Sequence, residues 1–321
     1  MVESIVGELI NGKIELNSME LEAGKGEAIV KIDYMSPCDL DTMFYKRSLV
    51  NNFPPIRVGY EGAGRVVVAN DCKNFKPGDP VIIHPWLGND IVCPGTLATH
   101  TVVNENHLVK IEYNITGIEA SLIGCSTAIA VSAIRRLVNM SPGMFTMVVG
   151  GNAVGLSLIT MINLYNSTEV TVADRSWDKV YKMEECGGGI RLVDNGGMSI
   201  SRKAKSLQDE KLCGLYDLIC IADSSLMSAD EALTCLSPTG KVLILDPTTP
   251  NNCDNGRVIY SPYGGADAGI VSYLNKIVSH MVYPLKDHMC DIIYNIEYAN
   301  KAFTSIADGT HNGRVVIRCS V

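Results

Sequence analysis

The chain has 321 residues, of which 46% are hydrophobic and 19% charged, so it can bury sizeable cores and disorder is not expected. Its 27 basic residues are outnumbered by 35 acidic ones, and the net charge of −8 argues against a nucleic-acid partner. No apolar run reaches the ~18 residues of a membrane span, and the start lacks the features of a signal peptide. No membrane partner is therefore expected. The chain has eleven cysteines and no CxxC pair, which predicts free thiols in a reducing, cytoplasmic compartment.

The N-terminal part of the chain, to about residue 120, has the pattern of a β-rich domain. Short apolar runs at 27–35, 64–70 and 80–85 are separated by turn residues. In one of these turns Pro77 and Gly78 take the two central positions that a type II turn prefers. This spacing favours a small barrel or sandwich.

Beyond about residue 120, apolar strands alternate with helical segments. Strands that are apolar throughout and separated by helices indicate a parallel sheet covered on both faces. Six of them fit a doubly wound, Rossmann-type sheet. The predicted strands cover residues 145–150, 169–174, 190–195, 216–223, 241–246 and 257–262.

The C-terminal tail is predicted to contain a helix at 267–280, a polar stretch, a helix near 297–307 and a last strand from Arg314. This tail is too short to fold alone, so we expect it to complete the first domain. The predicted fold is therefore α/β, with one domain at 1–126 plus 265–321 and a dinucleotide-binding domain at 127–264.

A glycine-rich turn follows the first strand of the predicted parallel sheet. It departs from the GxGxxG fingerprint at its middle position, where asparagine replaces glycine. Asparagine tolerates left-handed backbone conformations better than most residues, and a pyrophosphate would bind at the N-terminus of the helix that follows. The predicted phosphate-binding residues are Gly150, Gly151, Asn152, Ala153, Val154 and Gly155.

An acidic residue, Asp174, closes the next strand, 19 residues after Gly155. A carboxylate in this place binds the ribose hydroxyls of NAD and repels the 2′-phosphate of NADP. Lys179 lies five residues further on and is predicted to meet the same ribose. Arg175, next to Asp174, keeps NADP open as a second cofactor, and NAD is the cofactor we expect.

Four segments, followed by the Rossmann pattern, resemble the medium-chain alcohol dehydrogenases over nearly the full length. The resemblance implies a barrel-like, GroES-like catalytic domain and an inserted Rossmann domain. It also implies dimers or tetramers, and we expect a homodimer that pairs through the apolar strand 257–262. The segments are YMSPCDLD (34–41), GYEGAG (59–64), FKPGDPVII (75–83) and LIGCSTAIA (122–130).

The same resemblance implies zinc ligands at Cys38, Glu61 and Cys125, because these residues match metal-site positions of the family. Tyr60 stands where the family has its histidine ligand, and a neutral phenol is a poor zinc ligand. If zinc is bound, its fourth ligand would be Tyr60, His84 or water. Asp41 is predicted as a further catalytic-site residue that orients the zinc ligands.

Three functions follow from these residues. The first is an NAD(P)-dependent oxidoreductase that interconverts a small alcohol (a polyol, sugar or biosynthetic intermediate) and a ketone or aldehyde at the interdomain cleft, with zinc assistance. The second is a zinc-free enoyl, quinone or carbonyl reductase in which Tyr60 binds or protonates the substrate oxygen. The third is a non-catalytic nucleotide-binding protein of the same fold.

Overall fold

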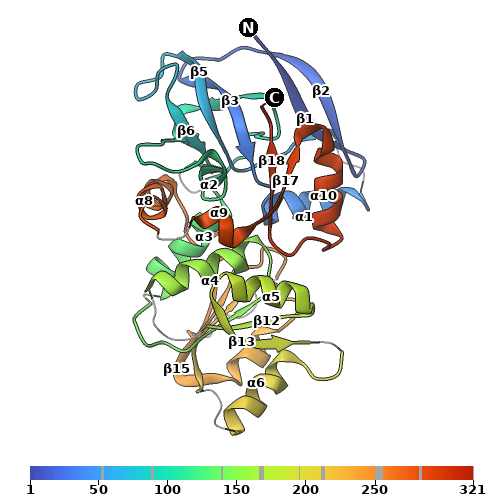
Figure 1. Cartoon of the computed structure of the whole chain (residues 1–321), viewed down its shortest axis with the longest axis vertical. Helices are drawn as coiled ribbons and strands as arrows, with labels where there is room; N and C mark the ends of the chain where they lie inside the picture. Colours follow the sequence, from blue (N-terminus) through green and yellow to red (C-terminus); the bar gives the residue numbers. More distant parts are fainter. Residues whose placement is uncertain are drawn as a thin grey trace. The chain divides into compact units, whose positions relative to one another are not determined.

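The computed structural model describes residues 1–51, 54–87, 90–138, 140–165, 170–194, 196–210, 214–249, 256–281 and 284–320. The chain divides into two compact units (Figure 1). Unit 1 comprises Met1–Ala128 and Asp267–Val321, and unit 2 comprises Ile129–Ala266. The boundaries expected from the sequence were 126 and 265.

Unit 1 is built on strands that pair antiparallel, with the exception of β17 and β18 near the C-terminus. One sheet has the order β2-β1-β4, and a second has the order β10-β6-β5-β3-β18-β17, with β9 also paired to β3. The strands before the Rossmann segment are β1 (Val2–Ile10), β2 (Lys13–Leu21), β3 (Glu27–Met35), β4 (Ile56–Arg57), β5 (Gly62–Asn70), β6 (Pro80–Ile83), β7 (Trp86–Leu87), β8 (Asp90–Ile91), β9 (His100–Asn104) and β10 (Leu108–Lys110).

The turn before β6 has the predicted geometry. Gly78 has a φ of 94°, and the N–H of Asp79 donates to the carbonyl oxygen of Lys76 at 3.1 Å. A type II turn needs this positive φ at its third residue, which glycine supplies without strain. The helical segments that precede the parallel sheet in the chain are α1 (Asp39–Ser48), η1 (Glu105–His107), α2 (Gly117–Ser121), α3 (Ser126–Ser132) and the π-helical turn η2 (Ala133–Val138).

The C-terminal tail returns to unit 1, and this prediction is confirmed. Strand β18 (Arg314–Arg318) pairs antiparallel with β3, so that Ile317 lies opposite Met35 (Figure 1). The sequence predicted only a polar stretch between the two helices of the tail. This prediction was wrong in part, because a strand forms there and pairs parallel with β18. The other tail elements are α8 (Ala268–Val278), α9 (Leu285–Met289), β17 (Cys290–Asn295), η3 (Ile296–Tyr298) and α10 (Ala299–Ala307).

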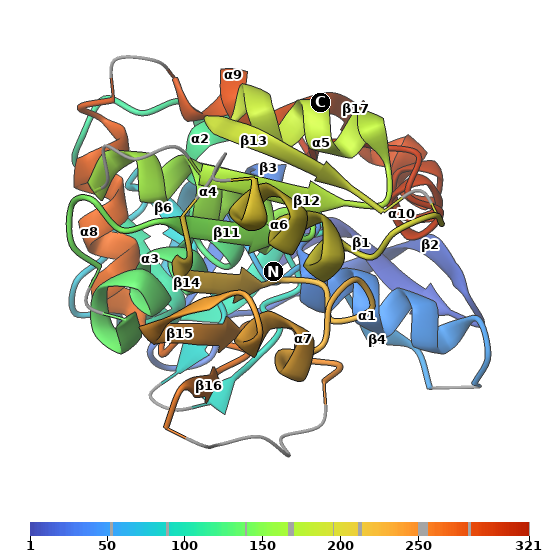
Figure 2. The same cartoon turned by 90° about the horizontal axis from the view of Figure 1, so that it is seen from below.

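Unit 2 contains the predicted six-stranded parallel sheet, in the order β13-β12-β11-β14-β15-β16 (Figure 2). Because all strands are parallel, their carboxyl ends lie at one edge. The strand order reverses between β11 and β14, where a doubly wound sheet binds its ligand. The strands are β11 (Thr146–Val149), β12 (Val170–Asp174), β13 (Gly188–Val193), β14 (Tyr216–Ile221), β15 (Leu236–Ile244) and β16 (Val258–Tyr260).

Helices cover both faces of this sheet, as its apolar strands require. Met147, Ile219 and Val242 belong to one buried cluster with residues of α6 (Ile200–Asp209) and α7 (Ala229–Leu233). Alternate residues of the same strands point to the other face. Helices α4 (Ala153–Tyr165) and α5 (Trp177–Glu185) contact each other and β12.

Strand β16 ends the parallel sheet, as the sequence predicts. The homodimer expected through this strand stays a prediction. Within the part of the chain that the structure describes, no helix is both long and apolar enough to span a membrane.

The glycine-rich turn at 150–155 needs glycine where its backbone atoms lie close to one another. A Cβ atom at Gly155 would lie 1.8 Å from the carbonyl oxygen of Gly150, where backbone has to move. We expect Gly155→Ala to lower the free energy of unfolding by about 2–3 kcal/mol. Gly214→Ala is the matched control, because its Cβ would meet only ordinary contacts of 3.5 Å with Phe145. Urea unfolding tests this, and equal stability of the two variants would contradict the packing account.

Candidate functional site

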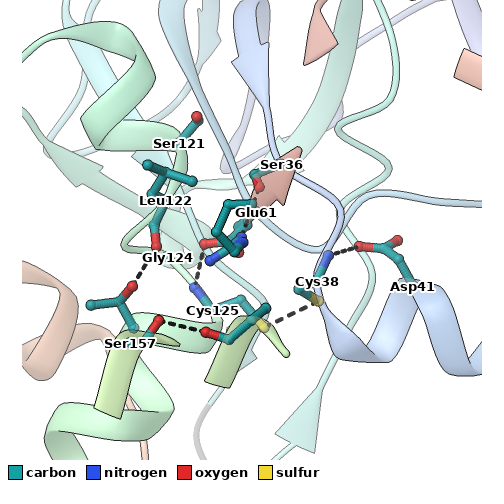
Figure 3. Close-up of polar contacts among 12 residues, drawn as sticks. Ser36, Cys38, Asp41, Glu61, Ser121, Leu122, Gly124, Cys125 and Ser157 are labelled. Carbon is teal, nitrogen blue, oxygen red and sulfur yellow. Dashed lines mark hydrogen bonds and ion pairs between the residues drawn. The ribbon is translucent and has the colours of Figure 1, made fainter. Parts of the chain in front are cut away.

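Two cysteines predicted as metal ligands lie side by side in unit 1. Cys38 is the N-cap of α1, and Cys125 directly precedes α3. Their Sγ atoms are 3.5 Å apart, and both residues are almost completely buried (Figure 3). The fold therefore brings together two thiols that are 87 residues apart in the sequence.

Asp41 holds Cys38 in place. Its carboxylate accepts hydrogen bonds from the backbone N–H of Cys38 at 3.1 Å and from that of Gly59 at 2.7 Å. Asp41 is completely buried, and burial raises its pKa while these hydrogen bonds oppose the rise. The side chain thus joins the start of α1 to the loop that carries Tyr60, which is a positioning role.

Glu61, the third predicted ligand, is bound by an arginine. Its Oε1 accepts a hydrogen bond from Nη2 of Arg314 at 2.6 Å, and its Oε2 accepts one from the backbone N–H of Cys125 at 2.9 Å. Arg314 also donates to the Ser36 hydroxyl at 2.8 Å. Both charged side chains are buried. Burial of a carboxylate is costly without partners, and here each of its oxygens accepts a hydrogen bond from the protein.

Tyr60 lies next to this group, in the place of the family's histidine. Its ring stacks on Phe44, with centroids 6.3 Å apart, and its hydroxyl makes no hydrogen bond with any described residue. Burial raises the pKa of the phenol above its ordinary value of 10, and the proximity of Cys93, Asp41 and Cys38 adds to the rise. Tyr60 is therefore a neutral hydrogen-bond donor at physiological pH.

The pKa values of the two buried thiols are raised as well. Burial raises the pKa of Cys38 well above its ordinary value, since the thiolate loses its hydration, and the contact with Cys125 adds to it. Without a metal ion nearby, such a thiol is a weak nucleophile, because attack needs the thiolate.

His84 lies outside this group and is part of the core. Its Nδ1 accepts a hydrogen bond from the backbone N–H of Trp86 at 3.2 Å, and its ring packs near His107. Nε2 has no partner within the described part of the chain, and burial lowers the pKa of His84 to about 3. The imidazole is therefore neutral, and its electrostatic neighbours are His107 and Asp267 rather than the two thiols.

The glycine-rich turn of unit 2 connects β11 to α4 as predicted. Gly150 has a φ of 102° and packs against Asp223, so a side chain there would be strained. Asn152 accepts a hydrogen bond from the N–H of Gly155 at 2.9 Å and donates one to the carbonyl oxygen of Ala222 at 2.8 Å. The asparagine thus caps α4 and attaches the turn to the end of β14.

The predicted ribose-binding carboxylate lies against this turn. Asp174 ends β12, and its Oδ2 accepts a hydrogen bond from the N–H of Gly151 at 2.9 Å. Ala153 and Val154 form the first turn of α4, and the N–H groups of a helix N-terminus can bind an anion. Lys179 lies on α5 and is half-buried, and its ammonium makes no ion pair or hydrogen bond to the described residues.

Comparisons with known proteins show which family this chain resembles. A model of the alcohol dehydrogenase GroES-like domain matches residues 24–113. An NAD-dependent alcohol dehydrogenase of Sulfolobus acidocaldarius is 26% identical over 57% of this chain and 59% of its own length. The uncharacterized zinc-type alcohol dehydrogenase-like protein YdjJ of Escherichia coli K12 is 24% identical over 74% of each chain. The chain therefore contains an alcohol dehydrogenase GroES-like domain and is similar to zinc-type alcohol dehydrogenase-like proteins over most of its length.

The similarity in fold extends over the whole chain. The crystal structure of benzyl alcohol dehydrogenase from Acinetobacter calcoaceticus aligns with all of both chains, at a TM-score of 0.85 and 15% identity. The predicted GroES-like domain and Rossmann sheet are thereby confirmed as a fold. The individual site residues stay predictions.

The described residues do not fit the zinc site that this resemblance implies. Zinc needs four ligands, or three and a water, and two sulfur atoms converge here. Glu61 is occupied by Arg314 and by the N–H of Cys125, and Tyr60 is a protonated phenol. No group of three or more histidine, cysteine, aspartate or glutamate side chains in the described segments is arranged to hold a metal ion.

Arg314 is the site residue that sequence reasoning missed. Its signal was present, since it directly precedes three apolar residues, Val315, Val316 and Ile317, which are buried in the strand. A buried arginine needs an anionic partner, but the sequence does not say that Glu61, 253 residues away, supplies it.

The burial of His84 predicts a pH-dependent loss of stability. Its imidazole, with an ordinary pKa of 6.5, binds a proton in the unfolded chain below that pH but stays neutral when folded. Between pH 7 and pH 5, wild type should lose about 2 kcal/mol more unfolding free energy than His84→Asn, which cannot titrate. Urea unfolding at each pH measures this difference. His280→Asn, an exposed control, should follow wild type, whereas parallel profiles for wild type and His84→Asn would refute the assignment.

Proposed function

We propose that this chain is an NAD(P)-dependent oxidoreductase that interconverts a small alcohol and a ketone or aldehyde without a zinc ion. The observation that carries the proposal is the phosphate turn, in which Gly150 and Gly155 permit a close backbone approach and Asp174 is bonded to Gly151. A turn of this kind between a parallel strand and a helix binds a dinucleotide pyrophosphate. NAD is the expected cofactor, because a buried carboxylate repels a 2′-phosphate.

Tyr60 supplies the polar contact to the substrate oxygen in this proposal. A bound nicotinamide would supply hydride to the carbonyl carbon in the reducing direction, and the oxygen that gains negative charge would then need a proton. A neutral phenol donates a hydrogen bond to that oxygen and then transfers its proton, which solvent restores. The raised pKa of Tyr60 keeps this proton in place across the physiological range.

The two thiols and Asp41 position Tyr60 rather than react. Asp41 accepts hydrogen bonds from the N–H groups of Cys38 and of Gly59, and Gly59 directly precedes Tyr60. Cys38 and Cys125 are buried and neutral, so they pack as small apolar groups. The substrate is proposed to be a polyol, sugar or biosynthetic intermediate, the classes that the family resemblance favours.

Removal of one hydroxyl tests this mechanism. Tyr60→Phe should lower kcat for carbonyl reduction by about 10²–10⁴-fold, the usual contribution of a general acid, with little change in nucleotide binding. Tyr113→Phe removes a hydroxyl from an exposed tyrosine of the same unit and should leave kcat unchanged. The assay follows oxidation of NADH and NADPH against a panel of ketones and aldehydes, with and without a chelator.

Three outcomes of this assay separate the candidate functions. Full activity of Tyr60→Phe would refute the role of the phenol, and loss of activity with chelator would restore a metal mechanism. Binding of nucleotide with no turnover of any carbonyl or alcohol would favour the non-catalytic alternative.

A further inference from the structure

The backbone on both sides of Tyr60 is fixed by hydrogen bonds. The N–H of Thr96 donates to the carbonyl oxygen of Gly59 at 3.0 Å, and the Thr96 hydroxyl donates to that of Glu61 at 2.7 Å. Gly59 has a φ of 107°, and a Cβ atom there would lie 2.5 Å from the backbone nitrogen of Leu97. The main chain that carries Tyr60 therefore has little room to move, and the direction of its hydroxyl depends on how the ring is held.

Within the described part of the chain, the ring of Tyr60 makes one aromatic contact. It stacks on Phe44 of α1, with ring centroids 6.3 Å apart and an angle of 14° between the ring planes. Parallel rings at this distance are offset, which is a favourable arrangement for two aromatic side chains. The Tyr60 hydroxyl makes no hydrogen bond to a described residue that could fix the ring instead. The stack on Phe44 is therefore the contact that holds the ring in one orientation.

Helix α1 supplies both contacts to this segment. Asp41 and Phe44 are three residues apart, so they lie on the same face of the helix. Oδ1 of Asp41 accepts a hydrogen bond from the N–H of Gly59 at 2.7 Å, and Phe44, one turn later, packs on the ring of Tyr60. One rigid element thus holds the backbone before the tyrosine and the ring of the tyrosine itself, and leaves the hydroxyl free for a ligand.

We propose that Phe44 is a positioning residue, which directs the Tyr60 hydroxyl toward the oxygen of the substrate. This inference rests on the proposed function, in which that hydroxyl donates a hydrogen bond to the carbonyl oxygen. A hydrogen bond weakens steeply away from linear geometry, and a displacement of about 1 Å can lower a rate by about 10²-fold. Phe44 has no polar side-chain atom and acts only through the ring that it holds.

A double-mutant cycle separates this role from a general effect on packing. Phe44→Leu removes the stack but keeps an apolar side chain, and it should lower kcat for carbonyl reduction about tenfold, with the KM for the nucleotide unchanged. In the Tyr60→Phe background the same substitution should leave the residual kcat unchanged, because no hydroxyl remains to be directed. Phe44→Tyr keeps an aromatic ring at this position and should retain most of the wild-type kcat.

Phe303→Leu is the matched control. Phe303 of α10 packs on Tyr45, the residue that follows Phe44 in α1, with ring centroids 5.7 Å apart. This variant also removes an aromatic pair from α1, but it should leave kcat unchanged when assayed well below the unfolding temperature.

Three results would overturn the role of Phe44: an unchanged kcat in Phe44→Leu, an equal loss of kcat with and without the Tyr60 hydroxyl, or an equal loss in Phe303→Leu. Full activity of Tyr60→Phe alone would instead refute the proposed function. The two failures are therefore distinguishable.

Discussion

The buried ion pair between Glu61 and Arg314 is the constraint on which the thiol site depends. Moving a carboxylate out of water costs several kcal/mol, and a bonded guanidinium offsets that cost. The pair joins the loop before β5 to β18, and the second carboxylate oxygen holds the backbone of Cys125. Removing one partner would leave a buried charge uncompensated, at about 3–5 kcal/mol. The C-terminal strand is therefore part of the site and not only of the sheet.

This pairing also decides what the thiols can do. Because Arg314 and the N–H of Cys125 occupy Glu61, the carboxylate is not free to join Cys38 and Cys125 around a cation. Tyr60 fills the next ligand position with a group that keeps its proton. The chemistry that remains to this group in unit 1 is that of a hydrogen-bond donor. Tyr60 in place of a histidine and the pairing of Glu61 with Arg314 thus both favour a mechanism without a metal ion.

Periodicity and turn chemistry were sufficient to predict most of the fold. The apolar strands of unit 2, the turn at Gly78 and the return of β18 all follow from local patterns and domain size. Strand β17 was missed because its residues are largely exposed and are ordered by pairing with β18. The partner of Glu61, the stacking of Phe44 on Tyr60 and the burial of His84 join residues that are distant in sequence. No single-sequence pattern encodes such pairings.

Metal content is the most direct test of the account's central claim. Elemental mass spectrometry of the protein, purified without chelator and dialysed against metal-free buffer, should find well below one zinc per chain in wild type. Tyr60→His, which restores an imidazole beside Cys38 and Cys125, should retain more zinc than wild type under the same conditions. Stoichiometric zinc in wild type that survives dialysis would contradict the account, because it would require Glu61 or Tyr60 to leave the contacts described here.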